Sequence, residues 1–179
     1  MPSNLEVKAT ASDWTRQLAR AGEIAAFCAL LWQRDTFFDA RSGRLKLREE
    51  RRGEDSAASA RLISYHRKDI AGPSQSKYRA ADVTDPAAMR DILAETLGIV
   101  VTVEKRRHLF LAGQTRIHLD DVDRLGRFIE IECPLQEAGD GHEARAILGD
   151  LIDALGILPG HLLTGAYADM LLASRRRDS

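Results

Sequence analysis

Cationic and aliphatic residues alternate along residues 43–48, and this two-residue period constrains the fold more than any other feature of the sequence. Arg44, Lys46 and Arg48 occupy alternate positions, with Leu45 and Leu47 between them. Successive side chains of a β-strand point to opposite faces, so the three cations would share one face and the two leucines the other. The segment is therefore predicted to be a strand with one charged face and one apolar face.

The same alternation recurs in three further segments, which are residues 4–8, 116–120 and 128–132. Four apolar strand faces cannot all meet water, because contiguous apolar patches of that size are rare on monomers. Helices are therefore expected to cover them. We predict an α+β fold in which eight antiparallel strands close into a barrel, with helices packed on the outside. An eight-stranded barrel encloses about one small ligand, so the charged faces would line a tunnel.

The order of predicted elements is consistent with a mostly antiparallel sheet in a single domain over residues 1–179. Strands are predicted over residues 5–10, 34–40, 44–50, 61–69, 77–83, 99–111, 114–120 and 127–135. Helices are predicted over residues 13–31, 142–155 and 166–173, and from Asp85-Pro86 to Gly98, because Pro favours the first turn and Gly the end of a helix. Residues 51–60 are predicted to form a loop.

Composition limits the classes of partner. The chain has 179 residues, of which 30% are charged, but its formal net charge is only −1. This balance gives no support for binding to nucleic acid or to an acidic membrane surface. The N-terminus has no basic segment followed by an apolar run, and no stretch is long enough to cross a bilayer, so a cytoplasmic location is expected. Cys28 and Cys133 are interpreted as buried thiols.

The charged residues assigned to the inner face favour a polyanion. They comprise eight cations, Lys8, Arg44, Lys46, Arg48, Arg67, Lys105, Arg107 and Arg116, and four carboxylates, Glu6, Asp120, Glu130 and Glu132. The excess of cations suits phosphate groups, to which Arg and Lys form strong charge-assisted hydrogen bonds. Glu130 and Glu132 share one strand face, and with Glu6 they could hold Mg²⁺ or Mn²⁺, which prefer oxygen ligands.

Several segments in this order resemble one known family. The N-terminal signature Glu-x-Glu-x-Lys is represented by residues 4–8, in which Asn4 replaces the first Glu while Glu6 and Lys8 match. The further matching segments are residues 35–38, 43–48, 65–67, 72–78, 105–107, 115–120, 128–132 and 167–172. The chain is similar to the CYTH group, or triphosphate tunnel metalloenzymes, which includes class IV adenylyl cyclases, thiamine triphosphatases and inorganic triphosphatases. That family has an eight-stranded antiparallel tunnel with helices outside.

The resemblance implies an enzyme that acts on a triphosphate with Mg²⁺ or Mn²⁺. It assigns all eight cations of the inner face to triphosphate binding and Glu6, Glu130 and Glu132 to the metal, with Asp120 close to it. Lys8, Arg116 and Glu130 are the candidate catalytic residues. Residues 63–69 and Gly72-Pro73 favour the class IV cyclase-like subgroup, which converts ATP to cyclic AMP and pyrophosphate. Hydrolysis of inorganic, thiamine or nucleoside triphosphate is the alternative. Members are often dimers, so a homodimer is an expectation.

Other interpretations of these residues stay open from the sequence. Because Asn4 brings no negative charge, a non-catalytic sensor that binds a nucleotide or polyphosphate in the same tunnel is a further alternative. Glu130 and Glu132 could instead be cross-strand ion-pair partners of Arg116 or Lys105. His118 has no His or Cys partner at a metal-ligand spacing, so a structural, hydrogen-bonded role is predicted for it.

Overall fold

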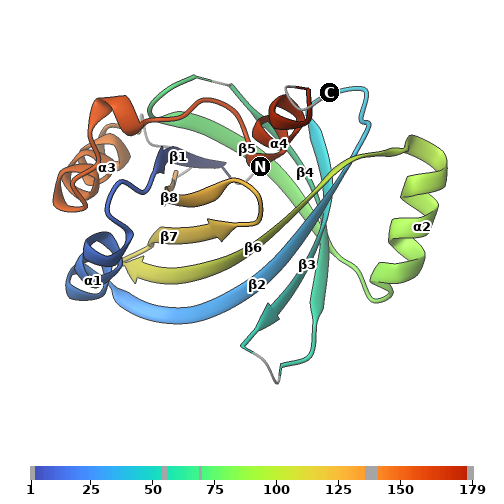
Figure 1. The fold of residues 1–179 in the computed structure, drawn as a ribbon, viewed down its shortest axis with the longest axis horizontal. Coiled ribbons are helices and arrows are strands. Elements are labelled where there is room, and N and C mark those ends of the chain that lie inside the picture. The colour runs from blue at the N-terminus through green and yellow to red at the C-terminus, as the bar shows by residue number, and fades with distance from the viewer. Residues whose placement is uncertain (1–2, 54–55, 69, 136–140, 177–179) are drawn as a thin grey trace.

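Eight antiparallel strands close into one barrel, as the sequence predicts (Figure 1). The computed structural model describes residues 3–53, 56–68, 70–135 and 141–176. Around the barrel the strands follow the order β1-β5-β4-β3-β2-β6-β7-β8. Their bounds are β1 Ser3–Thr10, β2 Ala26–Phe38, β3 Arg44–Arg52, β4 Ser59–Arg67, β5 Ser74–Asp82, β6 Ile99–Ala112, β7 Thr115–Val122 and β8 Gly126–Pro134.

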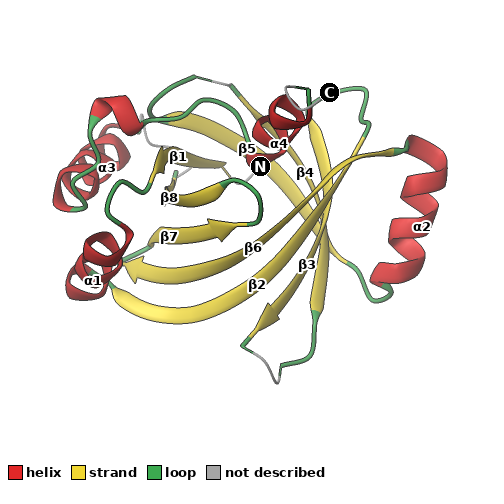
Figure 2. Cartoon of the chain, viewed as in Figure 1, coloured by secondary structure: helices red, strands yellow, loops and turns green. Residues whose placement is uncertain are grey.

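Helices cover parts of the outer surface, and Figure 2 shows them placed around the strands. They are α1 Trp14–Ile24, α2 Pro86–Leu97, α3 His142–Ala154 and α4 Tyr167–Arg175, with a short 3₁₀ helix at Pro159–His161. The outer faces of β1, β7 and β8 pack under α1 and α3, and this cluster buries Val7, Ile117 and Ile131. Leu47 of β3 packs under Met89 and Leu93 of α2. The predicted apolar outer faces therefore form the core between barrel and helices.

The C-terminal helix α4 plays a different part, because it packs against side chains on the inner side of the barrel. Tyr167 and Leu171 of α4 form one buried cluster with Phe37 of β2 and Val103 of β6. Phe37, Val103 and Tyr167 also line the central cavity. The helix therefore supplies an apolar floor to the charged interior.

The predicted helix over residues 13–31 is wrong in its second half. Asp13 does cap α1, where its side chain accepts a hydrogen bond from the backbone N–H of Arg16, but the helix ends at Ile24. Residues 26–38 then form the long strand β2, which pairs with β3 on one side and β6 on the other. The apolar run was compatible with either element, and two neighbouring strands decided in favour of the strand.

The remaining boundaries differ by a few residues from the prediction. The predicted loop at 51–60 is shorter, because β3 extends to Arg52 and β4 begins at Ser59, while Asp69 of the predicted strand 61–69 lies outside the described residues. Gly43 ends the β2–β3 connection at φ +68°, and a Cβ there would lie 2.7 Å from the carbonyl oxygen of Tyr65.

The structure also bears on the predictions for the two cysteines and for membrane-spanning segments. Cys133 is buried as predicted, whereas Cys28 is only partly buried. Among the described residues, no helix has the length and apolar character needed to span a membrane.

Candidate active site

Inward-facing side chains enclose a cavity of about 380 Å³ inside the barrel. Ten of the twelve predicted site residues line it, which are Glu6, Lys8, Lys46, Arg48, Arg67, Lys105, Arg107, Arg116, Glu130 and Glu132. Arg44 and Asp120 do not. The cavity is of a size that holds a small molecule, and its walls are built mainly of charged groups.

Three carboxylates gather on one wall, from β1 and β8. Glu6 lies directly opposite Glu132 in the register of these strands, and Glu130 is two positions along on the same face. Burial, together with the negative charges of Glu130 and Glu132, raises the pKa of Glu6 to about 7. Mutual repulsion of this kind is expected where carboxylates converge on a cation position, and their oxygens suit Mg²⁺ or Mn²⁺.

Cations pair with each of these carboxylates. Lys8 Nζ lies 2.6 Å from Glu130 Oε1, and Arg107 Nη2 donates to Glu130 Oε2 at 2.7 Å. Arg116 contacts Glu132 Oε2 at 2.8 Å through Nη2, and Arg67 donates to Glu6 at 2.7 Å. Glu132 therefore has the predicted partner Arg116, whereas Glu130 pairs with Lys8 and Arg107, and Lys105 pairs with Asp120 instead. The same contacts leave a metal role open, because a carboxylate oxygen has more than one lone pair.

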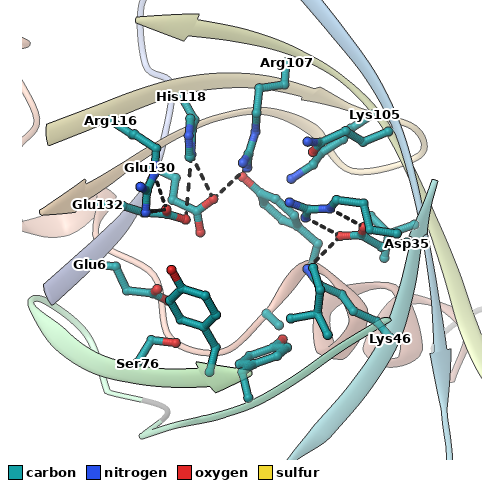
Figure 3. A pocket seen from close by; sticks show the side chains of 18 of the residues that line it. Glu6, Asp35, Lys46, Ser76, Lys105, Arg107, Arg116, His118, Glu130 and Glu132 are labelled. Carbon is teal, nitrogen blue, oxygen red and sulfur yellow. Dashed lines mark hydrogen bonds and ion pairs between the residues drawn. The ribbon is translucent and has the colours of Figure 1, made fainter. Parts of the chain in front are cut away.

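The opposite wall carries a second charge cluster, centred on Asp35 of β2 (Figure 3). Its carboxylate accepts from Lys46 Nζ at 2.8 Å and from Arg48 Nε and Nη2 at 2.7 Å each. Burial alone would raise the pKa of Asp35, but Arg48 and Lys46 outweigh it and hold that pKa well below its usual range. Asp35 was not among the predicted site residues. It lay within the predicted strand 34–40, and its inward position follows from the alternation of Gln33, Asp35 and Phe37 along β2.

Asp120 is fully buried behind the cavity wall, where it anchors other charged groups. Arg107 donates to both of its oxygens at 2.6 Å, and Lys105 Nζ lies 3.0 Å away. The hydroxyl of Tyr167 donates to it at 3.0 Å. Burial and the nearby Arg107 lower the pKa of Lys105 to about 7. With its oxygens engaged in this way, Asp120 is placed to orient Lys105 and Arg107.

Arg44 lies outside the cavity lining as well. Its Nη2 donates to Asp169 of α4 at 2.8 Å. The guanidinium therefore ties the start of β3 to the C-terminal helix.

The cavity is also lined by residues that were not predicted as site residues. They are Asn4, Leu31, Gln33, Asp35, Phe37, Glu50, Arg61, Ile63, Tyr65, Ser76, Tyr78, Ala80, Val103, Leu109, His118, Ala166 and Tyr167. Among the described residues, the lining contains eight cationic and five acidic side chains, an excess of three cations rather than the predicted four. A positive interior with a carboxylate cluster on one side can bind a phosphate chain between the two walls.

A sequence model of the CYTH domain matches residues 5–167. The chain belongs to the CYTH domain family. No curated protein matches this CYTH chain in sequence.

Solved structures share the same barrel. The PH1819 protein of Pyrococcus horikoshii has a TM-score of 0.80 at 21% identity, with 96% of this chain and 99% of that chain covered. A protein of Vibrio parahaemolyticus proposed to be an adenylate cyclase has a TM-score of 0.71 at 17% identity, covering 94% and 97% of the two chains. HpAC1 from Hippeastrum, a proposed adenylyl cyclase with a dominant triphosphatase activity, has a TM-score of 0.57 at 17% identity and covers 88% and 89%. At these identities the likeness establishes the CYTH fold alone.

Proposed function

We propose that this protein is a metal-dependent enzyme that binds a nucleoside triphosphate in its tunnel and converts ATP to cyclic AMP and pyrophosphate. The observation that carries the proposal is the pair of facing walls, with Glu6, Glu130 and Glu132 on one side and Lys46, Arg48 and Lys105 on the other. Family membership supports a triphosphate as the substrate. Apolar Leu31, Ile63 and Leu109 in the lining supply surface for an organic group beyond the phosphates.

The side chains of the tunnel would bind and orient the phosphate chain. Lys8, Arg67, Arg107 and Arg116 each have a carboxylate partner now, and phosphate oxygens would replace those partners when the substrate enters. Arg44, at the start of β3, would contribute little to phosphate binding because it does not line the cavity. Each cation stays neutralised when a phosphate oxygen replaces its carboxylate. The substrate can therefore be positioned with little rearrangement of the barrel.

Glu6, Glu130 and Glu132 would hold Mg²⁺ or Mn²⁺, while Asp120 would support the site by fixing Lys105 and Arg107. The bound ion would supply charge neutralisation to the phosphates. In the cyclase reaction the ribose 3′-oxygen bonds to the α-phosphorus, its proton is released, and the bond to the β-phosphate oxygen breaks to give pyrophosphate. The resemblance to the family makes Lys8, Arg116 and Glu130 the candidate catalytic residues, and in the structure Lys8 and Arg116 pair with Glu130 and Glu132 of the carboxylate wall.

Hydrolysis of a triphosphate is the second candidate. The observation that favours it is the dominant triphosphatase activity of HpAC1, which shares this fold. A non-catalytic sensor is the third candidate, because Asn4 replaces the first Glu of the family signature and brings no negative charge. In the orientation that satisfies its neighbours, the Asn4 amide oxygen accepts from Arg116 Nη2 at 3.0 Å.

Product analysis separates the three. The protein is incubated with ATP, thiamine triphosphate or inorganic triphosphate, each with Mg²⁺ and with Mn²⁺. Cyclic AMP with pyrophosphate is the expected result and would identify a cyclase. Orthophosphate would identify a hydrolase instead. Saturable binding without any product would identify a sensor.

Variants test the site itself. Lys46→Ala and Arg116→Ala are expected to weaken triphosphate binding about 10- to 100-fold, since each removes charge-assisted hydrogen bonds. Arg106→Ala is the matched control, because Arg106 neighbours Arg107 on β6 but is exposed on the outer face. Glu130→Gln should abolish metal-dependent turnover and retain phosphate affinity. An unchanged affinity in Lys46→Ala and Arg116→Ala would remove the tunnel as the binding site.

A cytoplasmic location, a homodimer, and the absence of nucleic-acid and membrane partners also stay predictions. They follow from the sequence composition and from the resemblance to the family.

A further inference from the structure

His118 of β7 lies in the carboxylate wall, although its sequence context predicts only a structural role. The side chain lines the cavity and is 4% exposed. It lies directly opposite Glu130 in the β7–β8 register, between the positions of Arg116 and Asp120. Figure 3 shows the imidazole pointing toward Glu130 and Glu132.

The ring nitrogen Nδ1 has no hydrogen-bond partner among the residues that the structure describes. Its nearest acidic atoms are Glu130 Oε2 at 3.5 Å and Glu132 Oε1 at 3.8 Å. Both distances exceed the range of about 2.7–3.2 Å for an N–H···O hydrogen bond. A buried polar nitrogen without a partner is unusual, so the gap between these three atoms calls for an occupant.

A cation can bridge the gap between these three atoms. Metal-to-ligand distances of roughly 2.0–2.2 Å mean that two ligands of one ion can be separated by up to about 4.2 Å. The two separations from Nδ1 fall below that limit. One donor atom from each of His118, Glu130 and Glu132 lies within 4.8 Å of the others.

The hydrogen bonds made by Glu130 and Glu132 leave each carboxylate able to bind an ion beside His118. Glu132 is held through Oε2 by Arg116, so Oε1 is the oxygen that faces the histidine. Glu130 Oε2 accepts from Arg107, and a carboxylate oxygen has a second lone pair. Phosphate groups that draw Arg107 and Arg116 away would release further negative charge to the cation.

We infer that His118 is a direct ligand of the divalent ion, through Nδ1, and that the centre is a mixed nitrogen and oxygen site. This inference rests on the proposed function of the same tunnel. Both ions prefer oxygen ligands, but Mn²⁺ is a transition metal and tolerates an imidazole nitrogen better than Mg²⁺ does. His118 should therefore strengthen the binding of Mn²⁺ more than that of Mg²⁺.

Pulsed EPR of the protein with Mn²⁺ tests the ligand directly. The experiment uses the full chain with ¹⁵N-labelled histidine, with and without inorganic triphosphate, which contains no nitrogen of its own. Triphosphate binding is measured separately by calorimetry in EDTA. The expected spectrum shows a ¹⁵N coupling to Mn²⁺ that disappears in His118→Leu.

Matched variants separate ligation from folding. His118→Leu should weaken Mn²⁺ binding by at least about tenfold and Mg²⁺ binding by less, since even an outer-sphere partner of a ligand is worth 10- to 100-fold. His118→Asn places an amide oxygen near Nδ1, so it should restore ion binding without the histidine coupling. His66→Leu is the control, because His66 is exposed on β4.

The outcomes distinguish the two proposals. Mn²⁺ bound to the triphosphate-loaded protein without a histidine coupling, or equal Mn²⁺ affinity in wild type and His118→Leu, overturns the ligand role of His118 alone. Failure of triphosphate to bind in EDTA overturns the proposed function. A folded His118→Leu protein, shown by an unchanged circular dichroism spectrum, makes either result decisive.

Discussion

Asp35 balances two cations of the tunnel wall. Its carboxylate is 3% exposed and contacts both Lys46 and Arg48, so two partly buried cations compensate one buried negative charge. Removing one member of such a cluster leaves buried charge without compensation, which costs more than the cluster contributes as a whole.

Asp35→Asn should therefore destabilise the ligand-free protein by about 3–5 kcal/mol. Inorganic triphosphate in EDTA should raise the free energy of unfolding of Asp35→Asn by more than it raises that of wild type, because its oxygens replace the missing carboxylate. Urea unfolding with and without triphosphate measures both the destabilisation by the substitution and the stabilisation by triphosphate. Asp39→Asn, at an exposed position, should change stability by less than about 0.5 kcal/mol. Equal stabilisation of Asp35→Asn and wild type by triphosphate would contradict a phosphate position beside Lys46 and Arg48.

At the scale of elements, α4 joins the apolar floor to the charged wall. The Tyr167 ring lies 3.7 Å from Lys8 Nζ, while its hydroxyl donates to Asp120. Leu171, one helical turn further on, is 1% exposed in the same cluster as Phe37 and Val103. The helix that closes the apolar cluster thus also orients cations of the tunnel.

Leu171→Ala is expected to lower the free energy of unfolding by about 2–5 kcal/mol, because it leaves a cavity in this cluster. Triphosphate affinity should fall as well, since Tyr167 loses its support. Leu158→Ala, which removes the same atoms from a side chain that is 60% exposed, is the control. Denaturant unfolding and calorimetric titration measure the two effects. Unchanged affinity in a destabilised Leu171→Ala protein would show that α4 supports the fold without supporting the site.

The contrast between β2 and β3 shows which elements sequence patterns could reveal. Charge and leucine alternate along β3, so its period was visible without the partner strands. The first half of β2, in contrast, is an apolar run that also continued the helical pattern of α1. Asp35 lay within the predicted strand 34–40, but it went unassigned because its alternate neighbours, Gln33 and Phe37, carry no charge that marks a common inner face.

At the scale of the whole molecule, buried carboxylates link stability to pH. Glu6 has a folded-state pKa of about 7 against an ordinary value of 4.5. Between these values the folded protein holds a proton that the unfolded chain has released. The native state then binds more protons than the unfolded state, so the free energy of unfolding falls as pH rises through this window.

Between pH 4.5 and about 7, Glu6 should therefore make the free energy of unfolding of metal-free wild type fall relative to that of Glu6→Gln. Urea unfolding in EDTA at several pH values measures both proteins, and their difference isolates Glu6 from other titrating groups. Mn²⁺ should reduce the loss in wild type, because the ion offsets the repulsion among Glu6, Glu130 and Glu132. A steeper decline in Glu6→Gln than in wild type would contradict the raised pKa.

The sequence by itself determined the barrel, its inside and outside, and most of the charged lining, because a two-residue period assigns each strand residue to a face without knowledge of its neighbours. Tertiary structure decided where those charges meet. Asp35 opposite the carboxylate wall, Asp120 withdrawn behind Arg107, and His118 Nδ1 facing Glu130 and Glu132 all depend on strand register, curvature and the packing of α4. The contacting pairs among these residues are 12 or more positions apart in the chain, and no local pattern encodes such contacts.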